Sequence, residues 1–392
     1  MTGAPFNLLD VTLFTGRREH DVFKRLRDAH PVYFHPEHDG GPGFYAVTRH
    51  ADAVKVLQAP DIFISGKGTQ IKDKRGEGHG APSIHNMDPP RHAKMRAKAM
   101  PGFRREILDA MAPRIRGIVR DLIAGCPNNE PFDFVEKVAL PLPMLVIGEL
   151  LGVPVQDRPL TVDWANTIAD ISASEAAQSK ARSELFQYFR KLVAEKRINP
   201  ADDMATLLAN ASVDGEPLTQ EELDAYFVVL TLAGNETTRF LVSGGLEQLC
   251  LQPKDLHSLR AAPQAIPAAV EEMVRWVSPV MLMRRTAAAD TEIAATPIRA
   301  GEKVVVYFVS ANRDERQFDD PQIFRVDRTD NRHVGFGTGP HFCLGAHLAR
   351  LEAHILFQEL LQMKSDITLV RPGDKLPSWW FSGYANLPIK WN

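Results

Sequence analysis

The sequence predicts a mainly α-helical protein with a small β region. Most of the chain consists of segments with apolar residues at the helical period, separated by short Pro/Gly-rich breaks. The longest segment, residues 219–251, opens with the capping box Thr219-Gln220-Glu221-Glu222 and would form a helix roughly 45 Å long. Strand-like segments are few and short, at residues 32–34, 44–47 and 304–308. No internal repeat or linker divides the 392 residues, so we expect a single domain, 1–392.

Composition narrows the class of protein. The chain is 44% hydrophobic and 24% charged, the balance of a soluble globular protein, and its net charge of −3 argues against general nucleic-acid binding. The longest apolar run, residues 225–233, is too short to span a bilayer, and residues 1–10 lack the pattern of a signal peptide. The three cysteines, Cys126, Cys250 and Cys343, are far apart and odd in number. Such usage is typical of a reducing compartment, so we expect a cytoplasmic protein with no membrane anchor.

The N-terminal third alternates short helices, strands and loops. Residues 20–29 and 51–58 read as helices on either side of the first two strands, and Pro60 ends the second helix. Residues 65–83 are polar and glycine-rich and are expected to form a loop. Because this stretch does not join a strand to a helix, a nucleotide-binding motif is excluded.

A basic segment follows, and its first helix opens at Asp88-Pro89-Pro90-Arg91-His92. His92 and Arg96 are four residues apart and therefore share one face of that helix. Residues 91–120 contain nine Lys or Arg but only two acidic residues, in a chain that is acidic overall. This local excess suggests that the segment docks an acidic partner.

The middle of the longest helix carries the sequence Ala233-Gly234-Asn235-Glu236-Thr237. Glycine is less favourable than alanine inside a helix by about 1 kcal/mol, so Gly234 is expected to serve close approach of a ligand to the backbone. Thr237 can loosen the helix by donating a hydrogen bond to a carbonyl one turn back. We therefore expect an irregularity in the helix at Gly234.

The C-terminal third holds further candidates. Glu272 and Arg275 lie three apart on one face of a predicted helix, residues 268–276. The apolar residues 279–283 precede Arg284-Arg285, and short strands are expected at 304–308, 367–370 and 387–390. Between the last two strands, Trp379-Trp380-Phe381 either dips into a pocket or packs as surface core.

A glycine-rich loop, residues 336–345, holds Cys343 immediately before a strongly helical run. Leu344, Leu348, Leu351 and Ile355 form an apolar stripe at the helical period. Unpaired N–H groups and the positive end of the helix dipole favour a thiolate at such a position, and a thiolate is a ligand for soft or borderline metals. The alternative is a buried structural cysteine in a Gly/Pro turn.

The pattern Phe336-x-x-Gly339-x-x-x-Cys343-x-Gly345 resembles the haem-binding loop of the cytochromes P450, the haem-thiolate monooxygenases. The resemblance implies that Cys343 is the axial iron ligand and that Phe336 packs beside haem b near the sulfur. It also implies that His341 contacts a haem propionate. The implied fold is mainly α, with the haem between the long central helix and the cysteine loop.

Four further segments resemble motifs of this family. Asp88-Pro89-Pro90-x-His92-x-x-x-Arg96 implies two propionate ligands, and Arg285 would be a third, with Arg284 as the other candidate. Ala233-Gly234-x-Glu236-Thr237 resembles the oxygen-activation motif, in which Glu236 replaces the commoner Asp. Glu272, Arg275 and Arg328 resemble a buried structural network rather than catalytic residues. The glycine-rich residues 65–83 would correspond to a lid over the substrate pocket.

The resemblance implies a monooxygenase that hydroxylates a hydrophobic small molecule, most readily a terpenoid or steroid, with O₂. Electrons would come from a ferredoxin-type partner and its reductase. We expect the substrate pocket to include five apolar residues: Leu232, Val280, Leu282, Trp380 and Phe381. Two alternatives are a peroxide-driven haem-thiolate enzyme and a non-catalytic haem-thiolate sensor. Neither needs the acid–alcohol pair Glu236–Thr237, which we expect to be catalytic, so the sequence disfavours both.

Overall fold

The computed structural model describes residues 6–37, 40–72, 82–169 and 173–392. Helices dominate this part of the chain, as the sequence predicts. Part of the predicted loop at residues 65–83, including the glycine-rich residues 76–80, lies outside the described residues, as do the first five residues of the chain. The α-helices are α1 (Val11–Thr15), α2 (Glu19–Ala29), α3 (His50–Leu57), α4 (Arg91–Ala99), α5 (Arg105–Ala124), α6 (Pro141–Leu151), α7 (Arg158–Ala169), α8 (Glu175–Ile198), α9 (Met204–Ala209), α10 (Gln220–Leu251), α11 (Pro253–Ala261), α12 (Ile266–Val277), α13 (Phe308–Ala311) and α14 (Ala346–Met363).

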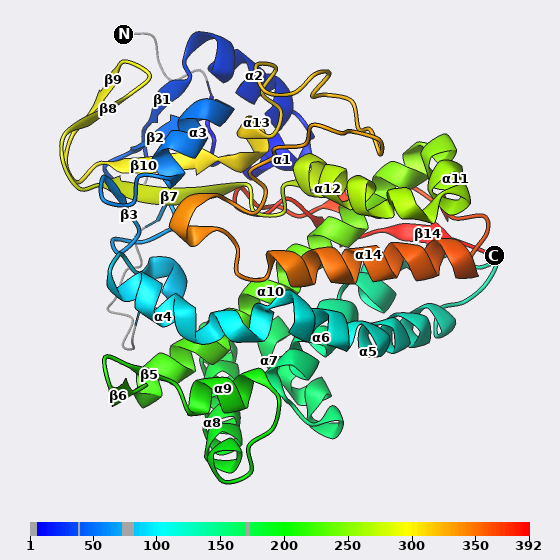
Figure 1. The fold of residues 1–392 in the computed structure, drawn as a ribbon. Coiled ribbons are helices and arrows are strands. Elements are labelled where there is room, and N and C mark those ends of the chain that lie inside the picture. Colours follow the sequence, from blue (N-terminus) through cyan, green and yellow to red (C-terminus); the bar gives the residue numbers. More distant parts are fainter. Residues whose placement is uncertain (1–5, 38–39, 73–81, 170–172) are drawn as a thin grey trace.

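The largest sheet has five strands, ordered β1-β2-β10-β7-β3. β10 pairs parallel with β2 and antiparallel with β7. Figure 1 shows this sheet with the N-terminal helices on one side of the molecule, while the long helices α5, α10 and α14 lie on the other. The bounds are β1 (Val32–His35), β2 (Phe44–Val47), β3 (Phe63–Ile64), β7 (Leu282–Ala287) and β10 (Lys303–Tyr307).

The remaining strands form small sheets at the periphery. One three-stranded sheet has the order β11-β14-β4, and three hairpin-like pairs join β5 to β6, β8 to β9 and β12 to β13. The predicted C-terminal strands are thus confirmed. Their bounds are β4 (Phe132–Asp133), β5 (Ser212–Val213), β6 (Glu216–Pro217), β8 (Thr291–Ile293), β9 (Thr296–Ile298), β11 (Thr368–Leu369), β12 (Asp374–Lys375), β13 (Tyr384–Asn386) and β14 (Pro388–Lys390).

Strand β7 separates two apolar cores because successive side chains point to opposite faces of a sheet. Leu282 packs in one cluster with Val305 and Tyr307 of β10. Met283 packs in the other cluster with Val304 and Val306. The two faces of this strand therefore serve different parts of the protein.

Helix α10 runs through the centre of the molecule and contacts α6, α8, α12 and α14 (Figure 1). Its predicted capping box is confirmed: the Thr219 hydroxyl accepts from the Glu222 N–H, and the Glu222 carboxylate accepts from the Thr219 N–H. The predicted irregularity at Gly234 is wrong, since α10 is continuous from Gln220 to Leu251. Neighbouring helices pack along its length, and this packing outweighs the low helix propensity of one glycine.

A buried ion-pair network anchors the segment that leads to the Cys343 loop. Arg275 donates two hydrogen bonds of 2.7 Å to Glu272, and Arg328 Nε donates to the same carboxylate at 3.0 Å. All three side chains are buried. The sequence prediction of a three-residue network is confirmed in its contacts, and its place in the core is typical of a structural element.

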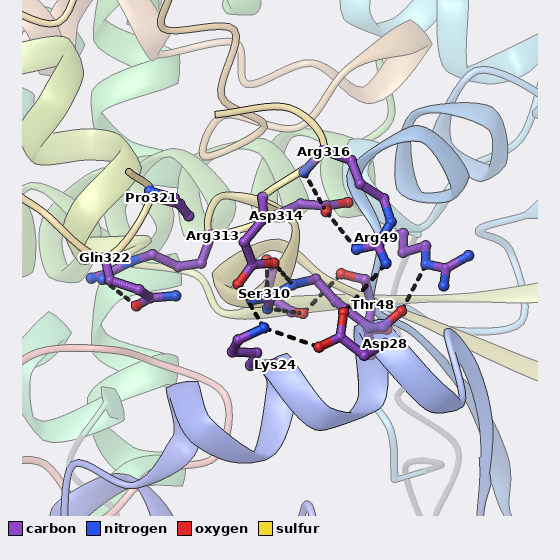
Figure 2. Close-up of polar contacts among 12 residues, drawn as sticks. Lys24, Asp28, Thr48, Arg49, Ser310, Arg313, Asp314, Arg316, Pro321 and Gln322 are labelled. Atoms are coloured by element: carbon purple, nitrogen blue, oxygen red, sulfur yellow. Dashed lines mark hydrogen bonds and ion pairs between the residues drawn. The ribbon is translucent and has the colours of Figure 1, made fainter. Parts of the chain in front are cut away.

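Polar contacts also fasten α2 to the segment after α13. Figure 2 shows Asp28 of α2 between Lys24 and Arg316, and Arg316 also contacts Asp314. The Ser310 hydroxyl of α13 donates to the Thr48 carbonyl, which follows β2, at 2.8 Å. These contacts link α2 and the end of β2 to α13 and the segment that follows it.

Among the described helices, none is both long enough and apolar enough to cross a membrane.

Candidate active site

A cavity lies between α10, the loop before α14, α4 and β7. Ala233, Gly234 and Thr237 of α10 form part of one wall. Phe336, Cys343 and Gly345 of the loop also line it. The structure thus brings together residues from three motifs that are separated by more than a hundred positions in the sequence.

The Cys343 loop is held by its own backbone and by two glycines. The Cys343 N–H donates to the Phe336 carbonyl at 2.9 Å. Gly337 and Gly339 have φ of 68° and 73°, a conformation that favours glycine, and a Cβ at Gly339 would lie 2.4 Å from the Leu57 carbonyl oxygen. Helix α14 begins at Ala346 with Gly345 as its N-cap, so Cys343 lies two residues before the cap. The loop therefore presents the sulfur to the cavity.

The local electrostatics of Cys343 differ from the expectation of a favoured thiolate. Burial among protein atoms raises the pKa of the thiol, although the Gly345 N–H and the charges of Arg96 and Arg350 act to lower it. Removal from water thus outweighs the helix terminus in the protein alone. A cation at the sulfur would reverse this balance, since a bound metal stabilises the thiolate.

Four nitrogen-bearing side chains gather along another edge of the cavity: His92, Arg96, Arg285 and His341. The rings of His92 and His341 stack 4.0 Å apart, and Arg96 Nη2 donates to the Phe342 carbonyl at 2.6 Å. Burial and the neighbouring cations lower the pKa of His341 to about 3, and burial also lowers the pKa of His92. Four such groups held together fit an anionic ligand.

In the part of the chain that the structure describes, none of these four side chains forms an ion pair with a carboxylate. The nearby carboxylate of Asp88 accepts the backbone N–H groups of Ser65 and Gly66 instead. His92 Nε2 is buried and has no hydrogen-bond partner among the residues that the structure describes. Within the described ranges, the hydrogen bond that the Arg285 side chain donates is to the Arg284 carbonyl, at 2.9 Å. These unmet donors fit the carboxylates of a haem, while the sulfur and the apolar walls fit its iron and its ring.

Thr237 and Glu236 take different positions around α10. Thr237 lines the cavity and donates its hydroxyl hydrogen to the Ala233 carbonyl at 2.9 Å, as predicted. Glu236 is not part of the lining; its carboxylate accepts from Arg239 at 3.0 Å, and burial raises its pKa. Adjacent helical residues differ by about 100° in direction, so the two side chains do not face the cavity together.

The chain is similar to proteins of one known family. The family model described as cytochrome P450 matches residues 156–365. The linalool 8-monooxygenase of Pseudomonas putida is 35% identical to this chain over 98% of it and 98% of its own length. The chain belongs to the cytochrome P450 family. It is therefore an oxidoreductase of the monooxygenase class.

Two further similarities extend over the whole P450 chain. The steroid C26-monooxygenase of Mycolicibacterium smegmatis is 32% identical over 98% of this chain and 93% of its own length. The structure of a Mycobacterium marinum cytochrome P450, CYP268A2, in complex with pseudoionone superposes with a TM-score of 0.89 at 35% identity, and each chain is covered completely. The haem-thiolate fold predicted from the sequence is thus confirmed.

The structure corrects most of the predicted substrate pocket of this P450. Val280 lines the cavity, but Leu232, Leu282, Trp380 and Phe381 do not. Leu282 faces the opposite side of the sheet from Met283, and Met283 lines the cavity in its place. Trp380 stacks on Phe381 at 4.6 Å, and Phe381 packs against Phe240, so the aromatic turn is part of the core. Leu232 packs against the main core.

Strand alternation also separates the two arginines that the sequence left as candidates. Arg285 lies on the same face of β7 as Met283 and lines the cavity. Arg284 lies on the other face, where it donates to the Thr286 hydroxyl at 3.3 Å. Arg285 is thus the arginine beside the His92 and His341 rings.

Several lining residues carry no motif and were missed. They come from the segment before α4 and from the helices α6, α10, α13 and α14, and include Thr69, Ile84, His85, Ile147, Val229, Leu230, Phe308 and Glu352. The sequence could have predicted Val229 as a lining residue, because Val229, Ala233 and Thr237 are four residues apart and therefore share one face of α10. Glu352 is buried, and its Oε2 has no partner in the described part of the chain; burial raises its pKa well above the usual value.

Proposed function

We propose that this P450 uses haem b to insert one oxygen atom of O₂ into a C–H bond of a hydrophobic small molecule. The observation that carries the proposal is the cavity that Cys343 shares with the nitrogen-bearing side chains of His92, Arg96, Arg285 and His341. Cys343 would hold the iron, and His92, Arg96, Arg285 and His341 would hold the propionates. Phe336, Gly345, Ala233 and Gly234 would border the ring. When bound, the haem supplies activation of O₂.

The protein's own part in oxygen chemistry is to deliver protons within an apolar cavity. We assign the Thr237 hydroxyl to hold and donate a proton at this wall, and Glu236 to resupply it. Burial raises the pKa of Glu236 above that of a free carboxyl group, and this direction favours proton uptake by the side chain. Its ion pair with Arg239 means that it must leave this contact, or act through water, to reach Thr237.

The substrate is proposed to be an apolar molecule, a terpenoid or a steroid. Ile84, Val229, Leu230, Val280 and Met283 supply aliphatic surface to the cavity. Such surface selects ligands by shape and hydrophobic burial rather than by charge. Two of the similar proteins are named for linalool and steroid oxidation, which supports these two classes.

Turnover experiments test this function against its two alternatives. The purified holoenzyme would be screened with terpenoids and steroids for a substrate-induced shift of the haem spectrum, and each binder would then be incubated with reductant, ferredoxin and reductase. We expect hydroxylated product under these conditions and little product with peroxide alone. Efficient product formation from peroxide without reductant would favour a peroxygenase. Ligand binding without product under either condition would favour a sensor.

We further propose that the basic segment docks a ferredoxin-type partner, but with fewer free charges than the sequence suggests. Six of its nine cations form ion pairs: Arg91, Lys94, Arg105, Arg114, Arg116 and Arg120. Arg104 is exposed and has no ion-pair partner in the described chain. Met100 of this segment is 51% exposed, and Phe342, whose carbonyl accepts from Arg96, is 40% exposed; both supply apolar surface beside the segment. We expect Arg104 to steer the partner.

The docking proposal predicts a charge effect on electron transfer. Arg104→Glu should slow reduction by ferredoxin several-fold at low salt, because exposed charges act over about 10 Å in 0.1 M salt. Wild-type rates should also fall as ionic strength rises. Arg299→Glu is a matched charge reversal on an exposed residue after β9 and should leave the rate unchanged. Equal rates for wild type and Arg104→Glu at low salt would contradict the assignment.

A further inference from the structure

An ion-pair cluster that the functional motifs do not include lies beside Phe336. Arg350 of α14 donates to Glu271 of α12 through two hydrogen bonds, Nε to Oε1 at 2.5 Å and Nη2 to Oε2 at 2.8 Å. The ring of His333 contacts the same carboxylate at 3.2 Å. Two parallel bonds of this kind fix the orientation of a guanidinium as well as its position.

This orientation places the guanidinium over an aromatic ring next to the cysteine. The Arg350 carbon Cζ lies 4.4 Å from the centroid of the Phe336 ring. The backbone carbonyl of Phe336 in turn accepts a hydrogen bond from the Cys343 N–H. A short chain of contacts therefore runs from Glu271 through Arg350 and Phe336 to the proposed iron ligand.

The charge of Arg350 lies over the Phe336 ring, and Glu271 binds that charge. The guanidinium thus contacts both the carboxylate and the ring of the residue whose backbone carbonyl accepts the Cys343 N–H. Hydrogen bonds from Arg350 and His333 outweigh burial and hold the pKa of Glu271 at about 2, so the carboxylate stays charged. The side chains of Arg350 and Glu271 are about one-third exposed. Salt and water therefore screen the pair only in part.

We propose that Arg350 is a positioning residue whose charge, held over Phe336 by Glu271, raises the reduction potential of the haem that Cys343 would ligate. The proposal rests on haem ligation by Cys343. Reduction adds one electron near the sulfur, and a fixed positive charge nearby stabilises the reduced form. Removing that charge should lower the potential. Removing the charge of Glu271 should raise it, because Arg350 would then be less compensated.

Spectroelectrochemical titration of the holoenzyme tests this pair of opposite shifts. We expect Arg350→Gln to lower the equilibrium constant for reduction roughly two- to tenfold, and Glu271→Gln to raise it by a similar factor. Arg350→Lys keeps the charge without the two-pronged contact and should stay closer to wild type than Arg350→Gln. Arg116→Gln removes a cation that pairs with Glu359 on the same helix α14 and serves as the control, with no expected shift.

The carbon monoxide spectrum of each variant separates tuning from damage. A merely structural role would lower stability or the thiolate band in both variants and would shift the two potentials in the same direction or not at all. If variants that keep the thiolate band showed potentials shifted in the same direction, or not shifted at all, the proposal would be overturned. If the wild type lacked a thiolate band, the proposed haem ligation would fail instead, so the two failures are distinguishable. Arg350→Lys tests the charge even if Glu271→Gln does not fold.

Discussion

Replacing Cys343 by serine is expected to abolish the strongly red-shifted band of the reduced carbon monoxide complex. That band reports thiolate coordination, and a serine hydroxyl does not replace a thiolate as a ligand for haem iron. The loop itself should survive, because its glycine conformations and the Cys343 N–H bond to Phe336 do not depend on the sulfur. We therefore expect a folded protein with a complete loss of hydroxylation.

The other two cysteines provide the controls for this result. Burial raises the pKa of Cys126 to about 11 and that of Cys250 to about 12, which makes both poor thiolates. Cys126→Ser and Cys250→Ser should keep the band at full intensity. A Cys343→Ser protein that retained it would remove the basis of the proposed function.

Thr237→Ala is expected to separate reductant consumption from product formation. The variant should still bind haem and substrate and consume reductant and O₂, because the cavity walls are unchanged apart from one hydroxyl and one methyl group. Without this proton donor, most electrons should emerge as hydrogen peroxide, and the yield of product per reductant should fall roughly tenfold or more. The measurement compares product, peroxide and reductant in the same reaction.

Two further variants give this experiment its controls. Thr231→Ala removes a buried hydroxyl from the same helix, but Thr231 is not part of the cavity lining, so coupling should stay at the wild-type level. Glu236→Gln should slow oxygen consumption itself, because the substitution limits the supply of protons to Thr237 rather than their donation by Thr237. Wild-type coupling in Thr237→Ala with a native substrate would refute the assigned role.

Local patterns predicted the elements of this fold and the centre of its site. The capping box at Thr219 and the helical stripe after Cys343 depend on neighbours within a few residues, so the sequence alone identifies α10 and α14. The cavity places Cys343, Thr237 and His92 together, and all three belong to motifs with fixed spacing. Where short-range spacing determines position, prediction succeeded.

Tertiary contacts determined what the sequence analysis got wrong. Apolar character placed Leu282 in the pocket, but the register of β7 with β10 turns it to the other core. The cations of residues 91–120 were expected to be unpaired, because most of their ion-pair partners lie elsewhere in the sequence: Glu222, Asp214, Glu149 and Glu359. The motif pairs Glu236 with Thr237 but does not indicate the direction of either side chain; the ion pair with Arg239 holds Glu236 outside the cavity lining.

The two faces of β7 have a consequence for how this enzyme can diversify. Met283 and Arg285 border the cavity, whereas Leu282 and Arg284 belong to the opposite face. Libraries that randomise position 283 can therefore explore new selectivity without changing the separate core cluster that contains Leu282. A one-residue deletion in the strand would exchange the faces and turn a cation into an apolar interior. Substitutions at position 283 leave the register of β7 intact, whereas an insertion or deletion within the strand would shift it.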